Sequence, residues 1–151
     1  MVVSELTTSA SHAPKDLVGT WTLVSVVTER DGRKYDTYGP NAKGLLVFDA
    51  NGRYSIIFIA GDLPHFASGN RSSGTADESK AVVAGNLAHF GTCVVDEADK
   101  RFTFQIDRAT FPNWDGRHNK RAFFIRGDEL HFTDPHASAG GVAATVFERA
   151  K

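Results

Sequence analysis

Alternating apolar and polar residues recur in short runs along most of the chain, and this period of two predicts β-strands. The first run covers residues 17–28, with Trp21 and Leu23 on one face and Val26 on the other. Later runs predict strands over 43–49, 53–60, 91–95, 101–107, 120–126, 129–134 and 142–149. Short antiparallel strands at this spacing indicate a sandwich or a closed barrel. A barrel of about eight strands is just wide enough to hold one small ligand.

The turn at 51–52 predicts how two of these runs pair. Asn-Gly is a strong hairpin signal, and a two-residue turn there pairs Val47 with Ile56 and Leu45 with Phe58. Both faces of this hairpin are apolar, so one face is expected to meet the core and the other to be covered by a helix.

A second turn, at 127–128, predicts three cross-strand pairs: Ile125 with Leu130, Phe124 with His131, and Phe123 with Phe132. The fully apolar face of this hairpin is the expected interior, and His131 then falls outside. Arg121 has the same parity as Phe123 and therefore points inward. A buried Arg needs a partner, and the candidates are Asp107, Glu148, or a ligand carboxylate or phenolate.

One helix is expected in the middle of the chain. Thr75 and Glu78 fit a capping box, which marks a helix start. An apolar stripe at Val83, Leu87 and Phe90 extends the predicted helix to Leu87 or His89.

The segment Phe111-Pro112-Asn113-Trp114 is an aromatic loop between two predicted strands. An ordinary hairpin loop has no use for two large aromatics, so this loop is expected to fold onto the core or to close a pocket. Two interpretations stay open: a rigid plug at a closed barrel end, or a lid at an open mouth. Asn113 either caps the loop backbone or binds a ligand carbonyl.

Composition narrows the functional classes. The chain has 151 residues, 17 basic and 18 acidic, for a net charge of −1, which argues against nucleic-acid or membrane-surface binding. Residues 1–15 are predicted to be a flexible arm and residues 16–151 a single domain. Cys93 is the only cysteine, and no metal-ligand spacing or phosphate loop occurs, so no metal and no cofactor is predicted. The N-terminus shows no signal-peptide pattern, and we expect a cytoplasmic protein.

Several blocks together resemble the bacterial and fungal lipocalin-like domain family over roughly residues 16–149. They are Leu17-Val18-Gly19-Thr20-Trp21, Tyr38-Gly39-Pro40, Gly44-Leu45-Leu46, Phe66-Ala67-Ser68-Gly69, Phe90-Gly91-Thr92, Phe111-Pro112-Asn113-Trp114 and Gly127-Asp128-Glu129-Leu130. The resemblance implies an all-β fold with one inserted helix, an eight-stranded antiparallel calycin-type barrel with a small-molecule cavity.

The resemblance also carries expectations about single residues and about context. A Trp such as Trp21 closes one barrel end beneath an Arg from a late strand, here Arg121 or Arg149. Members often carry a His-His pair before the aromatic loop, whereas this chain has Phe104 and Gln105, so no role of that pair transfers. Some members sit beside natural-product or catabolic genes, which suggests secondary metabolism.

Candidate site residues follow from these placements. The ionisable candidates for catalysis are His89, His118, Asp107, Arg121 and Tyr38. The candidates for ligand contact are Phe58, Phe111, Asn113, Trp114, Phe123 and Phe132.

Three functions are weighed for this barrel. The first is binding of a small apolar or aromatic metabolite. The second is a cofactor-independent lyase, isomerase, dehydratase or cyclase that uses acid/base groups on an aromatic, polyketide or terpenoid substrate. The third is an interaction domain with a filled barrel. A small hydrophobic molecule is the expected partner, and a homodimer is a further expectation.

Overall fold

The computed structural model describes residues 15–151, and the predicted arm therefore lies almost wholly outside the described residues. The strands are β1 Gly19–Arg30, β2 Arg33–Asp36, β3 Lys43–Phe48, β4 Arg53–Ile59, β5 Asn86–Asp96, β6 Arg101–Ala109, β7 His118–Arg126, β8 Glu129–Asp134 and β9 Val142–Arg149. The helices are the 3₁₀ turns η1 Arg71–Ser73 and η2 Pro112–Trp114 and the α-helix α2 Ala76–Ala84.

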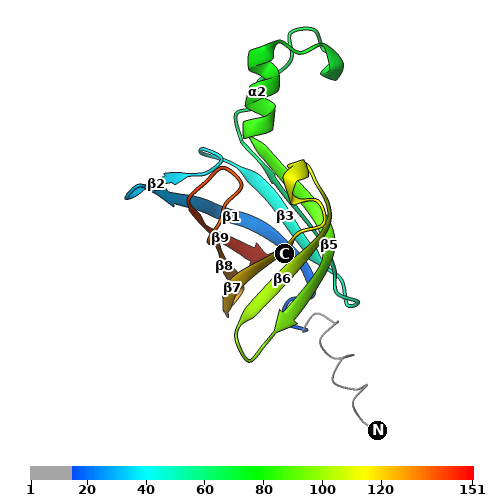
Figure 1. Ribbon diagram of the computed structural model, residues 1–151, viewed down its shortest axis with the longest axis vertical. Helices are drawn as coiled ribbons and strands as arrows, with labels where there is room; N and C mark the ends of the chain where they lie inside the picture. Colours follow the sequence, from blue (N-terminus) through cyan, green and yellow to red (C-terminus); the bar gives the residue numbers. More distant parts are fainter. Residues whose placement is uncertain (1–14) are drawn as a thin grey trace.

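The strands close into an antiparallel barrel (Figure 1). From β3 to β9 each strand pairs with the next, and β9 returns to pair with β1, where Trp21 lies opposite Arg149. Eight strands make the barrel, which confirms the predicted fold class. The short strand β2 pairs only with the last residues of β1. Within β2, Tyr35 pairs with Thr28 of β1.

The β7–β8 hairpin has the predicted register. Phe123 pairs with Phe132, and Phe124 pairs with His131. Gly127 has φ +59°, a value that favours glycine and fits a tight two-residue turn. His131 therefore lies on the outer face, where its ring stacks on Phe124.

The β3–β4 register differs from the prediction by one residue. Leu46 pairs with Ile56, and Phe48 pairs with Tyr54. The turn contains three residues, 50–52, because the Asp49 carboxylate accepts hydrogen bonds from the backbone amides of residues 51 and 53. A one-residue shift exchanges the faces of a strand, so Leu46 and Phe48 join Ile56 in the interior.

The helix is shorter than predicted and covers no sheet face. The capping box of Thr75 and Glu78 is present, but the helix ends at Ala84, because residues 86–92 pair with β4 instead. Val83 is 76% exposed. The helix projects beyond the barrel in Figure 1, and Ile57 on the outer wall stays partly exposed. His89 therefore lies on β5 and not at a helix end.

Strand β1 carries a β-bulge that reorients its second half. Its register against β9 shifts between Leu23 and Ser25. Such a bulge inserts one extra residue and reverses the alternation beyond it. Trp21 is buried before the bulge, and Val26 and Thr28 are buried after it, although the uninterrupted alternation placed Trp21 and Val26 on opposite faces.

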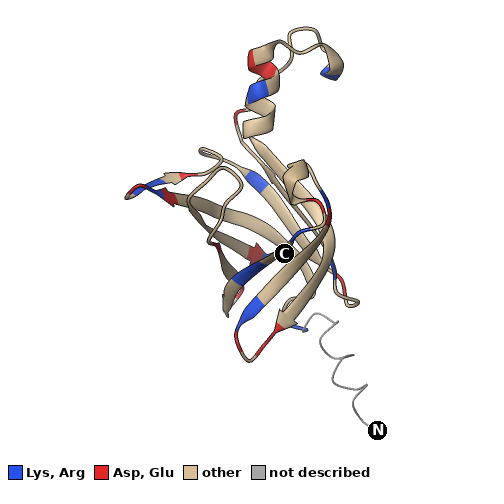
Figure 2. Cartoon of the chain, viewed as in Figure 1, with Lys and Arg blue, Asp and Glu red and all other residues tan. Residues whose placement is uncertain are grey.

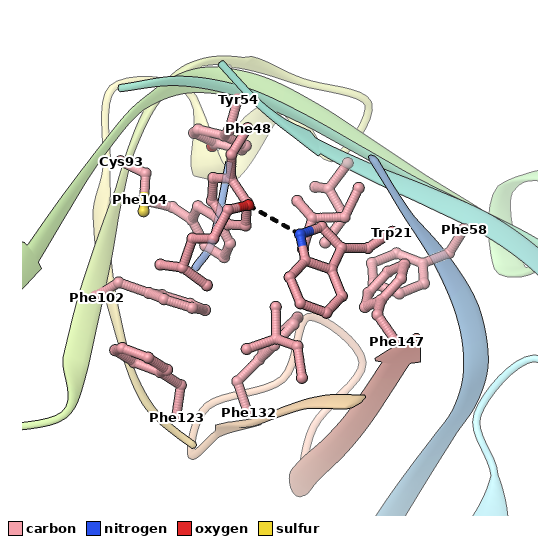
Figure 3. Close-up of a cluster of buried hydrophobic side chains, with 14 of the residues drawn as sticks. Trp21, Phe48, Tyr54, Phe58, Cys93, Phe102, Phe104, Phe123, Phe132 and Phe147 are labelled. Atoms are coloured by element: carbon pink, nitrogen blue, oxygen red, sulfur yellow. Dashed lines mark hydrogen bonds between the residues drawn. The ribbon is translucent and has the colours of Figure 1, made fainter. Parts of the chain in front are cut away.

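The barrel end that contains Trp21, here called the Trp21 end, is filled with side chains (Figure 3). Trp21 is 0% exposed, and its indole N–H donates to the Leu17 carbonyl at 2.9 Å. The Arg149 guanidinium carbon lies 4.3 Å from the centre of the Trp21 ring. Of the two arginines that the resemblance offered, Arg149 covers this tryptophan. Phe102 and Phe123 belong to the same cluster and stack on each other with ring centres 4.9 Å apart.

The opposite end of the barrel, here called the helix end, carries α2 and η2 (Figure 1). Lysines and arginines are interspersed with acidic residues along the strand ends and turns in Figure 2. Within residues 15–151 there is no helix with the length and hydropathy needed to span a membrane.

Candidate ligand-binding cavity

A cavity of about 540 Å³ occupies the barrel at the helix end. Its lining residues come from seven strands, from α2 and from three loops. They are Val26, Thr28, Thr37, Tyr38, Ile56, Phe58, Val83, Ala84, Asn86, Leu87, His89, Phe104, Thr110, Phe111, Pro112, Trp114, Arg121, Phe132, Asp134, Ala137, Ser138, Ala139, Gly140, Ala143 and Thr145. The exposed members of this set belong to α2 and the loops of the helix end, so the cavity opens there and the Trp21 end is closed.

Aromatic side chains form much of the wall. Tyr38 stacks on Phe58 with ring centres 5.4 Å apart, and Phe111 lies against Trp114 at 6.0 Å. Four of the predicted contact residues line the cavity: Phe58, Phe111, Trp114 and Phe132. Two others do not. Phe123 is packed in the core beneath it, and Asn113 is exposed outside the lining.

The aromatic loop lies at the helix end, opposite Trp21. Pro112 opens the turn η2, where its missing amide costs no hydrogen bond. The Asp115 carboxylate accepts from the Ala109 amide at 2.8 Å and from Arg108 at 3.0 Å, and so anchors the loop to β6. Trp114 is thereby buried against the cavity.

His89 is a buried, uncharged histidine on the cavity wall. It is 5% exposed, and Tyr54 places its hydroxyl 2.7 Å from Nδ1. Burial, and next the nearby Arg121 charge, lower the pKa of His89 to about 3. Burial also raises the pKa of Tyr54, which keeps its phenol protonated.

The tautomer of His89 is assigned from its contact with Tyr54. The Tyr54 proton has no other acceptor within residues 15–151 than His89 Nδ1. The phenol therefore donates to Nδ1, and in a neutral imidazole the proton then sits on Nε2. No residue in the described part of the chain hydrogen-bonds to Nε2, which remains accessible from the cavity.

Arg121 is another buried polar group of the cavity wall. It is 4% exposed, and its Nη2 lies 3.3 Å from Oδ2 of Asp134. Its guanidinium carbon lies 5.7 Å and 5.8 Å from the ring centres of Phe104 and Trp114. Burial lowers the pKa of Arg121, and Asp134 opposes that effect.

Arg121 pairs with Asp134, and not with Asp107 or Glu148 as predicted. Asp107 lies on the outer wall and pairs with Arg53 at 3.2 Å, where both side chains are about half exposed. Glu148 is likewise exposed. Residues at even positions of β8 point inward, as Leu130 and Phe132 do, so the same parity could have identified Asp134.

Of the two remaining ionisable candidates, Tyr38 lines the cavity and His118 does not. Tyr38 lines the cavity, and burial, with a smaller effect from Asp134, raises its pKa to about 12. His118 is exposed at the start of β7, outside the lining. The structure thus brings Tyr38, His89 and Arg121 together and leaves Asp107 and His118 outside. Sequence reasoning missed Tyr54 and Asp134, the partners of the two buried groups.

The chain matches one family model. The model described as "Lipocalin-like domain" covers residues 18–149. A comparison with curated proteins finds no match.

Several solved structures of low sequence identity are similar to this chain. The lipoprotein YedD from Klebsiella pneumoniae has TM-score 0.48 and 9% identity, over 94% of this chain and 78% of that one. The REP1-NXSQ fatty acid transporter has TM-score 0.43 and 13% identity, over 91% and 98%. Human cRBP IV has TM-score 0.39 and 20% identity, over 91% and 100%. These similarities are too remote to bear on a ligand.

Proposed function

This chain belongs to the lipocalin-like domain family, and from that premise we propose that it binds a small apolar or aromatic molecule in the cavity at the helix end. The observation that carries the proposal is the cavity itself, about 540 Å³ with a largely aromatic and aliphatic lining. Ligand pockets have volumes of about 300–1,000 Å³ and combine apolar walls with a few placed polar groups. Here those groups are Tyr38, His89 and the Arg121–Asp134 pair.

An acid/base enzyme is the second candidate, since Tyr38, His89 and Arg121 all reach the cavity. General acid–base catalysis is most efficient when the pKa of the group lies near the working pH. The pKa values of His89, about 3, and of Tyr38, about 12, lie far from neutrality. These two groups are therefore better suited to orient a ligand by hydrogen bonds than to transfer its protons.

Native mass spectrometry and thermal unfolding against a panel of aromatic and polyketide metabolites test the proposal. We expect a retained 1:1 complex and a raised Tm. A ligand at about 100 times its Kd stabilises the folded state by about 2.7 kcal/mol.

Two matched variants locate the binding. Ala143 lines the cavity, so Ala143→Phe fills it and is expected to abolish binding. Ala144 is the next residue of β9 and is exposed on the outer wall, so Ala144→Phe is expected to leave binding intact. Binding that survives Ala143→Phe, or a panel without any ligand, would contradict the proposal. A chemically altered metabolite after incubation would favour the enzyme instead.

A role in secondary metabolism, a cytoplasmic location and a homodimer stay predictions from the sequence.

A further inference from the structure

Two of the buried polar groups of the cavity, His89 and Arg121, lie around the same pair of aromatic rings. His89 on β5 has its ring centre 5.4 Å from that of Phe104 and 5.7 Å from that of Trp114. Arg121 on β7 approaches the same two rings at 5.7 Å and 5.8 Å. Both groups are more than nine-tenths buried. A ligand group that reaches this part of the wall therefore meets both of them.

Both groups present hydrogen-bond donors. The tautomer set by Tyr54 leaves the Nε2–H of His89 facing the cavity. Arg121 has five N–H donors; within residues 15–151 only the Lys120 carbonyl, at 3.4 Å, accepts a hydrogen bond from it, and Asp134 forms an ion pair with it at 3.3 Å. The matching ligand group is consequently a hydrogen-bond acceptor.

The charges of the site are already balanced. Arg121 and Asp134 form a buried ion pair at 3.3 Å, and His89 is neutral because burial lowers its pKa to about 3. A ligand carboxylate would bring a third, uncompensated charge into this apolar region and would lie close to the Asp134 carboxylate. Burying an unpaired charge is costly, whereas a neutral oxygen accepts the same hydrogen bonds without that cost.

We propose that the cavity selects a neutral apolar molecule with one oxygen acceptor, such as a ketone, at its buried end and discriminates against the carboxylate of the same shape. The inference rests on the proposed function, because it names the ligand class of the same cavity. It also replaces the carboxylate or phenolate that the sequence suggested for Arg121, since Asp134 already fills that role.

Two pairs of isosteric probes test the inference by isothermal titration at pH 7.5: 2-acetylnaphthalene with 2-naphthoate, and 2-undecanone with decanoate. In each pair a methyl group replaces a carboxylate oxygen, so shape is nearly constant and charge differs. We expect the ketone to bind about tenfold or more tightly than its carboxylate, a difference of about 1.4 kcal/mol. A carboxylate that binds as tightly as its ketone would overturn the inference and leave the proposed function standing. If no member of either pair binds, both are contradicted.

Substitution of Asp134 tests the cause of the discrimination. Asp134→Asn removes the negative charge and keeps the oxygen that accepts from the His136 amide. It is expected to raise carboxylate affinity relative to ketone affinity about tenfold or more. Asp107→Asn makes the same chemical change on the outer wall and is expected to leave the ratio unchanged. An unchanged ratio in a folded Asp134→Asn variant would overturn the charge argument.

Because Asp134→Asn weakens a buried ion pair and could prevent folding, a second variant probes the donors. His89→Phe keeps an aromatic ring against Phe104 and Trp114 and removes the Nε2–H. One hydrogen bond is worth about 1 kcal/mol, so ketone affinity is expected to fall about fivefold. Unchanged ketone affinity would show that His89 does not contact the ligand oxygen and would overturn its assigned role.

Discussion

Trp21→Ala is expected to destabilise the barrel more than any other single truncation at its closed end. The side chain is 0% exposed, and truncation of a buried Trp costs about 3–5 kcal/mol. The lost hydrogen bond to Leu17, 2.9 Å long, accounts for about 1 kcal/mol of this. The lost contact with Arg149, at 4.3 Å, accounts for about 0.5–2 kcal/mol. Both losses place the expected value in the upper part of that range.

The free energy of unfolding is measured by urea denaturation followed by circular dichroism, with the slope m as the check that the same surface is exposed. Val24→Ala is the matched control on the same strand, because Val24 is 49% exposed, and it is expected to change stability by no more than about 0.5 kcal/mol. If Trp21→Ala does not fold, Trp21→Phe keeps most of the apolar surface and is expected to lose about 1–2 kcal/mol. A loss below about 1 kcal/mol for Trp21→Ala would refute the assignment of Trp21 as the barrel plug.

Three further perturbations address the helix end. Trp114→Ala is expected to reduce ligand affinity more than stability, because one side of the ring faces the cavity; equal loss of both in titration and denaturation would make the aromatic loop a structural plug. His89 should make stability depend on pH: its pKa falls from 6.5 to about 3 on folding, so its contribution is complete above pH 6.5. That contribution is lost toward pH 3 by about 1.4 kcal/mol per pH unit, since only the unfolded chain binds the proton. The free energy of unfolding, measured by urea denaturation at pH 7 and pH 5, should fall with this pH dependence in the wild type and with a weaker one in His89→Phe. The same pH dependence in both proteins would contradict the buried neutral state. Arg121→Met alone should lose about 3–5 kcal/mol because it leaves Asp134 buried and unpaired, whereas Arg121→Met with Asp134→Leu should be nearly neutral in the same assay; equal losses would mean that the two side chains are not coupled.

The register of a hairpin could be predicted from the sequence only where the sequence revealed the length of the turn. At 127–128 a two-residue turn fixed the pairing, and the inward positions of Arg121, Phe123 and Phe132 followed from it. At 50–52 the side chain of Asp49 caps a three-residue turn, and the Asn-Gly signal does not reveal that third residue. The resulting one-residue error exchanged the predicted faces of β3 relative to β4.

The helix boundary was mispredicted for a different reason. Val83, Leu87 and Phe90 have helical spacing by coincidence, and the chain leaves the helix at Gly85 to pair with β4. Leu87 and His89 also share the alternation of Cys93, which is the pattern of a strand with one buried face. Where two periods fit the same residues, long-range pairing decides between them, and a single sequence does not show which strand is available to pair.

Asp134 bears on two properties, the stability of the barrel and the ligand preference of the cavity. A buried ion pair is weak evidence for stability, because an apolar pair of similar volume is often as stable. The Arg121–Asp134 pair lies on the cavity wall, with donors of Arg121 left over beside the unpaired Nε2–H of His89. Without Asp134 the same cavity would carry one positive charge and would favour anions. The pair therefore affects which ligand is bound more than how stably the barrel folds. The double variant Arg121→Met with Asp134→Leu is expected to retain stability, whereas Asp134→Asn, which leaves the Arg121 charge without its partner, is expected to weaken the preference for a ketone.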